Sequence, residues 1–216
     1  MIAATGLRWL LSALFALPAL YGLWSGLAPG KPATHRVDHL LHAAMGLAMI
    51  AMVWPWGMDL PAGPQVVLFV AGALWFAGAA LFRADASHRA KASLAALPHV
   101  VMMGAMAWMV AAMDPSGMTA TGGGGAMADM PGMDMSASVG AATMHLTGTG
   151  QRLAAVLLAV VLAVVALRWL AHAFDVARSG RADGSEAAVR HVGGALDPAC
   201  HAAMGLGMAV MFALMA

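Results

Sequence analysis

The segment HAAMGLAMIAM at residues 42–52 decides the fold, because two related segments occur elsewhere in the 216-residue chain. A near copy, HAAMGLGMAVM, begins at His201, and a looser copy, HVVMMGAMAWM, begins at His99. All three share the pattern His-x2-Met-x3-Met-x2-Met. On an α-helix this spacing places the four side chains within an arc of about 80° and over a rise of about 15 Å. Each segment therefore predicts a helix face that carries soft metal ligands headed by an imidazole, and we call such a face a ladder.

The composition around these segments is that of an integral membrane protein. The chain is 62% hydrophobic and only 10% charged, too few charges to cover a soluble globule. Its net charge of +1 offers no basic patch for nucleic acid, and no Gly-rich phosphate loop indicates nucleotide binding. A single cysteine, Cys200, excludes an intramolecular disulfide and any CxxC motif. Without paired carboxylates or another catalytic constellation, we expect no enzymatic activity.

Six apolar segments are long enough to cross the roughly 30 Å of hydrocarbon in a bilayer. They span residues 7–27, 37–54, 65–82, 94–113, 151–173 and 195–215. The sequence thus predicts an all-α bundle of six transmembrane helices, built as three hairpins in series, with a ladder on the second helix of each. Such repetition predicts a pseudo-threefold arrangement. Helices one to four fall in residues 1–113, a link in 114–150, and helices five and six in 151–216.

Basic residues predict the orientation of the helices. Under the positive-inside rule, links rich in Lys and Arg lie in the cytoplasm. The links after helices one, three and five hold most of them: Lys31, Arg36, Arg83, Arg89, Lys91, Arg178, Arg181 and Arg190. We therefore expect a multi-pass protein of the cytoplasmic (inner) membrane with both termini outside. The first segment is interpreted as a retained helix. The three ladders would then be parallel, with their histidines near the cytoplasmic end.

The link at residues 114–150 differs from the others in composition. Four consecutive glycines at 122–125 precede a run of closely spaced methionines: Met127, Met130, Met133 and Met135. No apolar periodicity supports a fold, so the link is predicted to be a flexible extracytoplasmic loop. Methionine in a solvated loop contributes nothing to packing. These side chains therefore indicate metal collection.

Methionine sulfur indicates which metal the ladders would bind. A thioether is neutral and soft, and Cu(I) is its natural partner. Three parallel ladders predict three stacked sulfur rings above an imidazole ring. From the outside inward these rings are Met52, Met109 and Met211; Met49, Met106 and Met208; Met45, Met102 and Met204; and His42, His99 and His201. Successive weak sites of this kind let an ion move without being trapped.

The Met-x3-Met pairs Met45/Met49, Met102/Met106 and Met204/Met208, together with the Met-rich link, resemble the copper channels of the Ctr type. In that family three subunits each place such a pair on a pore-lining helix, so the resemblance implies copper transport. It is confined to these short motifs, and here three hairpins of one chain would take the place of three subunits. The chain as a whole is also similar to small six-helix actinobacterial membrane proteins of unknown function, which implies no activity.

We therefore expect a Cu(I) transporter or channel whose partners are the copper ion, the lipid bilayer and a copper-receiving protein. Two alternatives remain open. One is a membrane copper chaperone or oxidase assembly factor that holds Cu(I) without flux. The other is a haem or quinone redox protein that uses histidines as axial ligands. The direction of copper movement and the oligomeric state are not readable from the sequence.

Several residues near the ladders have a structural and a functional interpretation. Asp38 and Asp197 each precede a ladder histidine by four residues, where a carboxylate can orient an imidazole. For Asp197, followed by Pro198, we favour a helix N-cap instead. Cys200 is interpreted as a small buried residue. Ladder methionines can also be packing material.

Small and aromatic residues are expected to serve packing and anchoring. Gly46, Gly104 and Gly205 predict close helix approach. Trp169 is expected to anchor the protein at the membrane interface, and Trp75 to pack within the bundle.

Overall fold

A computed structural model describes residues 5–82, 89–113, 149–182 and 185–216, with side chains left out at Met58 and at 180–193. Apart from one short 3-10 helix, η1, the secondary structure of these residues is α-helical. Six helices are long and apolar enough to cross a membrane. This confirms the predicted all-α, six-helix membrane bundle. The elements are α1 (Thr5–Leu27), α2 (Ala33–Val53), η1 (Pro55–Asp59), α3 (Ala62–Phe82), α4 (Arg89–Met113), α6 (Thr149–Ala182) and α7 (Ser185–Met215).

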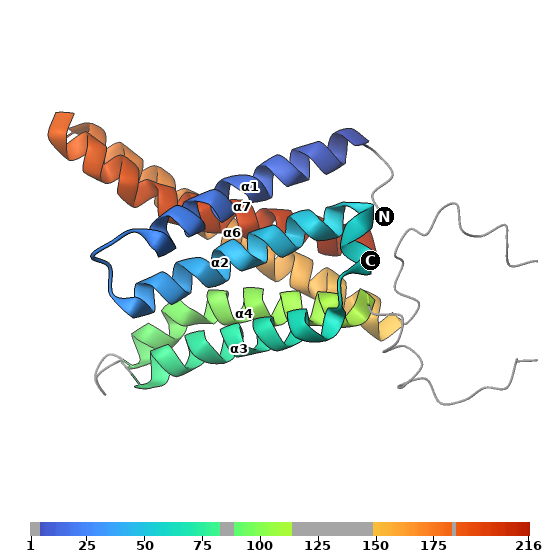
Figure 1. The fold of residues 1–216 in the computed structure, drawn as a ribbon. Helices are drawn as coiled ribbons and strands as arrows, with labels where there is room; N and C mark the ends of the chain where they lie inside the picture. Colours follow the sequence, from blue (N-terminus) through green and yellow to red (C-terminus); the bar gives the residue numbers. More distant parts are fainter. Residues whose placement is uncertain (1–4, 83–88, 114–148, 183–184) are drawn as a thin grey trace, which may run out of the picture.

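The helices form three hairpins arranged in a closed ring. The most extensive pairings are α1 with α2, α3 with α4, and α6 with α7. Neighbouring hairpins meet through α2 and α3, through α4 and α6, and through α7 and α1. In each case the second helix of one hairpin contacts the first helix of the next, and the series closes on itself. This cyclic rule agrees with the predicted pseudo-threefold arrangement. The ladder helices α2, α4 and α7 all run in the same direction (Figure 1).

The last hairpin is longer than its sequence predicted. Helix α6 was expected to end at residue 173 but continues to Ala182, and α7 begins at Ser185 rather than near 195. The 34 residues of α6 correspond to about 51 Å, more than a bilayer core requires. Both helices therefore project beyond the other four at one end of the bundle (Figure 1). Hydropathy locates only the apolar part of a helix, so it missed the polar extension.

The N-cap interpretation of Asp197 is wrong. Helix α7 begins well before this residue, and Pro198 lies inside the helix. Pro98 lies inside α4 in the same way, next to a ladder histidine. Proline is tolerated within membrane helices because neighbouring groups satisfy the backbone atoms that it frees.

Glycine permits close contact in the first and last hairpins. A Cβ atom on Gly46 would lie 3.0 Å from Cβ of Ala19, and one on Gly205 would lie 3.2 Å from Cβ of Ala166. The prediction of close approach is confirmed at both positions. It is wrong at Gly104, where no atom lies within 4 Å of a Cβ position.

In the middle hairpin the two helices also approach closely, but here the large residue is on the ladder helix and the glycine is on its partner. Four residues after His99, at the position that glycine occupies in the other two ladders, stands Met103, which is fully buried. Its sulfur lies 3.3 Å from where Gly72 of α3 would carry a Cβ. The large side chain on the ladder helix is thus accommodated by a glycine on the partner helix.

The ladder methionines form the centre of the bundle. Exposure is 0–2% for Met45, Met49, Met102, Met106, Met109, Met204 and Met208, and 6% for Met211. These residues belong to one core cluster that also contains Phe15, Phe69 and Phe212, and the half-buried Met52 packs against it. The thioethers therefore face the interior. Leucine and valine dominate the exposed outer surface, as a lipid-facing surface requires.

Candidate metal centre

The three ladder histidines meet at one level of the bundle. Ring centroids are separated by 4.5 Å for His42 and His201, 4.9 Å for His99 and His201, and 5.2 Å for His42 and His99. One potential ligand atom from each ring lies within 4.8 Å of the other two. An ion bound to three nitrogens at about 2.0–2.1 Å needs separations of about 3.5 Å between them. Small side-chain movements are therefore enough for these residues, the triad, to hold a metal.

Backbone carbonyl groups fix how these imidazoles are presented. Nδ1 of His42 lies 2.7 Å from the carbonyl oxygen of Asp38, and Nδ1 of His201 lies 2.7 Å from that of Asp197. A carbonyl oxygen only accepts hydrogen bonds, so Nδ1–H must be the donor and Nε2 keeps its lone pair for a metal. Nε2 of His42 is buried and has no hydrogen-bond partner among the described residues.

The third histidine follows the same rule with a different residue upstream. His99 makes a backbone hydrogen bond to Ala95, four residues earlier. Because the backbone supplies the acceptor, any side chain can occupy that position. This explains why a carboxylate precedes two of the histidines and an alanine the third.

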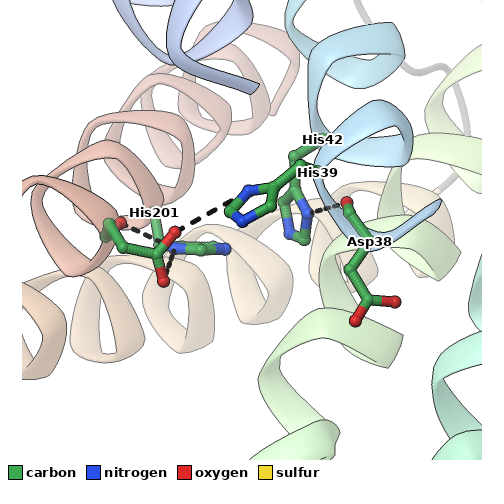
Figure 2. Close-up of polar contacts among 5 residues, drawn as sticks. Asp38, His39, His42 and His201 are labelled. Carbon is green, nitrogen blue, oxygen red and sulfur yellow. Dashed lines mark hydrogen bonds and ion pairs between the residues drawn. The ribbon is translucent and has the colours of Figure 1, made fainter. Parts of the chain in front are cut away.

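The two upstream carboxylates have separate roles (Figure 2). The Asp38 carboxylate accepts a hydrogen bond of 2.7 Å from Nε1 of Trp75 on α3, so the expectation that it orients His42 is wrong. The Asp197 carboxylate faces imidazoles instead. Its Oδ2 lies 3.8 Å from Nδ1 of His201, and its Oδ1 lies 3.9 Å from Nδ1 of His39. The Asp197 carboxylate therefore faces a triad imidazole directly, whereas the Asp38 carboxylate is turned toward Trp75.

Two aromatic side chains that the sequence had not assigned to the site flank the triad. Phe76 of α3 stacks on His99 at 5.1 Å and meets His42 edge-on at 5.4 Å. Trp169 of α6 lies 5.3 Å from His99 and 5.1 Å from His201. Trp169 therefore packs against the triad.

A cavity of about 390 Å³ leads to the triad, and we call it the vestibule. Its walls come from the first halves of α2 and α4, the end of α3 and part of α7. Small side chains give it room. The lining residues are His35, Asp38, His39, His42, Phe76, Ala79, Ala80, Ala92, Ala95, Ala96, His99, Asp197 and His201. Because α2 starts at Ala33, His42 lies about 13 Å along its helix from the first residue.

The methionines continue the same column beyond the triad. The ladder helices are parallel and their histidines share one level. The three methionines of each predicted sulfur ring, which we call a rung, therefore lie at similar heights along the bundle axis. These heights are about 4.5, 10.5 and 15 Å beyond the triad. The loop methionines Met127, Met130, Met133 and Met135 lie outside the described residues.

Comparisons with known proteins identify a family and relatives. The family described as Domain of unknown function (DUF5134) matches residues 34–215, which include all three ladders. Uncharacterized protein Rv0970 of Mycobacterium tuberculosis and Uncharacterized protein Mb0995 of Mycobacterium bovis are each 38% identical over 109 residues. That match covers 50% of this chain and 50% of each relative, so the chain spans about half the length of the curated relatives it matches. No solved structure matches the chain.

Proposed function

This chain belongs to the DUF5134 family, and we propose that it binds Cu(I) inside the membrane and conducts it along the column of triad and methionine rungs. One observation carries the proposal. Three imidazoles from three parallel helices each bring one ligand atom within 4.8 Å of the other two, and the same helices carry methionines that are buried in a shared core. Packing alone requires no such match of ligand types between helices.

The charge near the triad supports a monovalent ion. A buried cation is costly unless an opposite charge compensates it. Neutral imidazoles and thioethers contribute no charge, and the carboxylate of Asp197 contributes one negative charge at 3.8 Å from His201. The one carboxylate that faces a triad imidazole at this distance matches the single charge of Cu(I). Thioether sulfur adds selectivity for the soft ion.

The proposed membrane orientation follows from the basic residues. The vestibule lies toward the end of the bundle where the Lys- and Arg-rich links occur, so it faces the cytoplasm. The methionine rungs then lie between the vestibule and the outer surface. The loop with Met127, Met130, Met133 and Met135 collects or receives Cu(I) outside, where several weak contacts raise the local ion concentration.

A copper-holding protein without flux is the second candidate, and the burial of the ladders favours it. Eight of the nine ladder methionines are at most 6% exposed, so an ion must displace packed side chains to pass. The vestibule alone could then load and unload the triad. The redox alternative with haem has less support, because imidazole rings 4.5–5.2 Å apart leave no space for a macrocycle between them.

Flux measurements separate the two candidates. Purified protein reconstituted into liposomes should take up Cu(I), and Ag(I) as its mimic, faster than empty liposomes do. A protein that binds Cu(I) in detergent but gives no flux would be a chaperone. A protein that binds neither ion would contradict both candidates.

A further inference from the structure

The vestibule holds a second set of metal ligands outside the triad. His35 and His39 lie one turn apart on α2, and their ring centroids are 5.7 Å apart. Asp197 of α7 reaches across the cavity, with Oδ1 placed 3.9 Å from Nδ1 of His39. Two imidazoles and one carboxylate, with space for water, are donors that borderline first-row metal ions accept.

The contact between His39 and Asp197 leaves one oxygen of the carboxylate without a hydrogen bond within the described part of the chain. Oδ1 of Asp197 is buried and lacks a hydrogen-bond partner among the described residues. A separation of 3.9 Å is too long for a hydrogen bond to His39. It does match two ligands on opposite sides of one ion, each at about 2 Å from the metal. A cation between these atoms would satisfy a carboxylate oxygen that otherwise remains unpaired.

Neighbouring groups hold this pair in place. The ring of His39 packs edge-on against Tyr21 of α1, with centroids 5.9 Å apart. The second oxygen of Asp197 lies 3.8 Å from Nδ1 of His201. The Asp197 carboxylate thus lies between His39 in the vestibule and His201 of the triad, within 4 Å of both.

We propose that His39 and Asp197, with His35 one turn before His39 on α2, form a second metal site, at which a partly hydrated ion is held between the cytoplasmic solution and the triad. This role as a staging site rests on the proposed function, although metal binding at the site does not. The site contains nitrogen and oxygen donors and no sulfur. It therefore accepts Co(II) and Zn(II) as well as copper, and selection for Cu(I) occurs deeper, at the triad and the methionines.

Co(II) is the probe that tests the site, because its visible absorption reports nitrogen and oxygen ligands. The full chain with H42Q, H99Q and H201Q removes the triad and should still bind one Co(II). Adding H39Q or D197N should weaken that binding by at least about tenfold. D59N is the control, since Asp59 lies in η1 and does not line the vestibule. It should leave Co(II) binding unchanged.

A second measurement avoids dependence on the triple variant, which loses three buried rings. In the otherwise unaltered protein, H39Q should reduce the number of bound Co(II) ions by one. Equal Co(II) stoichiometry with and without H39Q would overturn the second site, and so would equal losses in D59N and D197N. If Co(II) binds in the vestibule but Cu(I) does not bind the protein, the proposed function fails and the second site stands.

Discussion

The two ends of the ligand column differ in how the structure prepares them for a metal. At the vestibule end, backbone carbonyls orient the imidazoles, and a cavity of about 390 Å³ reaches them. At the methionine end, no hydrogen bond can orient a thioether, and the side chains are packed in the core. The comparison teaches that hydrogen bonds fix the geometry of the triad, whereas packing alone holds the ladder methionines.

Removing the triad should have the largest effect. Replacing His42, His99 and His201 by Gln should lower the Cu(I) affinity of the protein by about a hundredfold or more, because the prepared ligands are lost. Competition with a colorimetric Cu(I) chelator measures this affinity. Circular dichroism checks that the helices remain. Affinity equal to that of the unaltered protein would place the tight site elsewhere and break the comparison.

Altering the middle rung should affect movement more than tight binding. Replacing Met49, Met106 and Met208 by Leu nearly conserves volume, so the fold should be retained. Flux of Cu(I) or Ag(I) into liposomes should fall by about tenfold, since one of the three rings of thioether ligands is missing. X-ray absorption of the copper-loaded variant should show fewer sulfur neighbours. Met58 lies in η1 outside the ladders, and M58L is a suitable control.

Filling the vestibule should slow metal exchange without removing a ligand. Ala96 lines the cavity, and the substitution A96F places a ring in that space. Loading of the triad in detergent should become several-fold slower, while the final affinity changes little. Stopped-flow mixing with Cu(I) measures the rate. An unchanged loading rate would show that ions reach the triad by another path.

Acidification should separate the two ends chemically. Protons compete with the metal for imidazole nitrogen, so Cu(I) affinity at the triad should fall as the pH is lowered. A thioether binds no proton in this range, so Ag(I) bound by the ladders of the triad-free variant should be independent of pH. Titrations of both proteins at several pH values test this difference. Parallel pH profiles would mean that the two ends share ligands.

Packing variants should have the smallest effect on binding while testing what holds the column in register. G46A places a methyl group 3.0 Å from Ala19, so we expect a loss of stability of about 1–3 kcal/mol. G104A meets no atom within 4 Å and exchanges glycine for a better helix former, so it should be neutral or stabilising. Thermal unfolding in detergent compares the two. Equal destabilisation would contradict the close helix contact at Gly46.

Much of the architecture was predictable because it depends on local pattern. Apolar length specified six helices, and the repeated ladder specified which helices face the interior. The positions of Met45, Met102 and Met204 follow from helical periodicity alone, which acts within one element. The helix starts were less accurate, because the polar first turns of a helix, such as those of α7, give no hydropathy signal.

The sequence by itself determined the membrane class, the three hairpins and the ligands on each ladder, since composition and spacing are properties of single helices. Tertiary structure alone decided which partners these ligands meet. The twin aspartates show this most clearly, because Asp38 and Asp197 occupy identical motifs yet one bonds to Trp75 and the other faces His39 and His201. Their side chains respond to the neighbouring helix, and a sequence motif does not contain that neighbour.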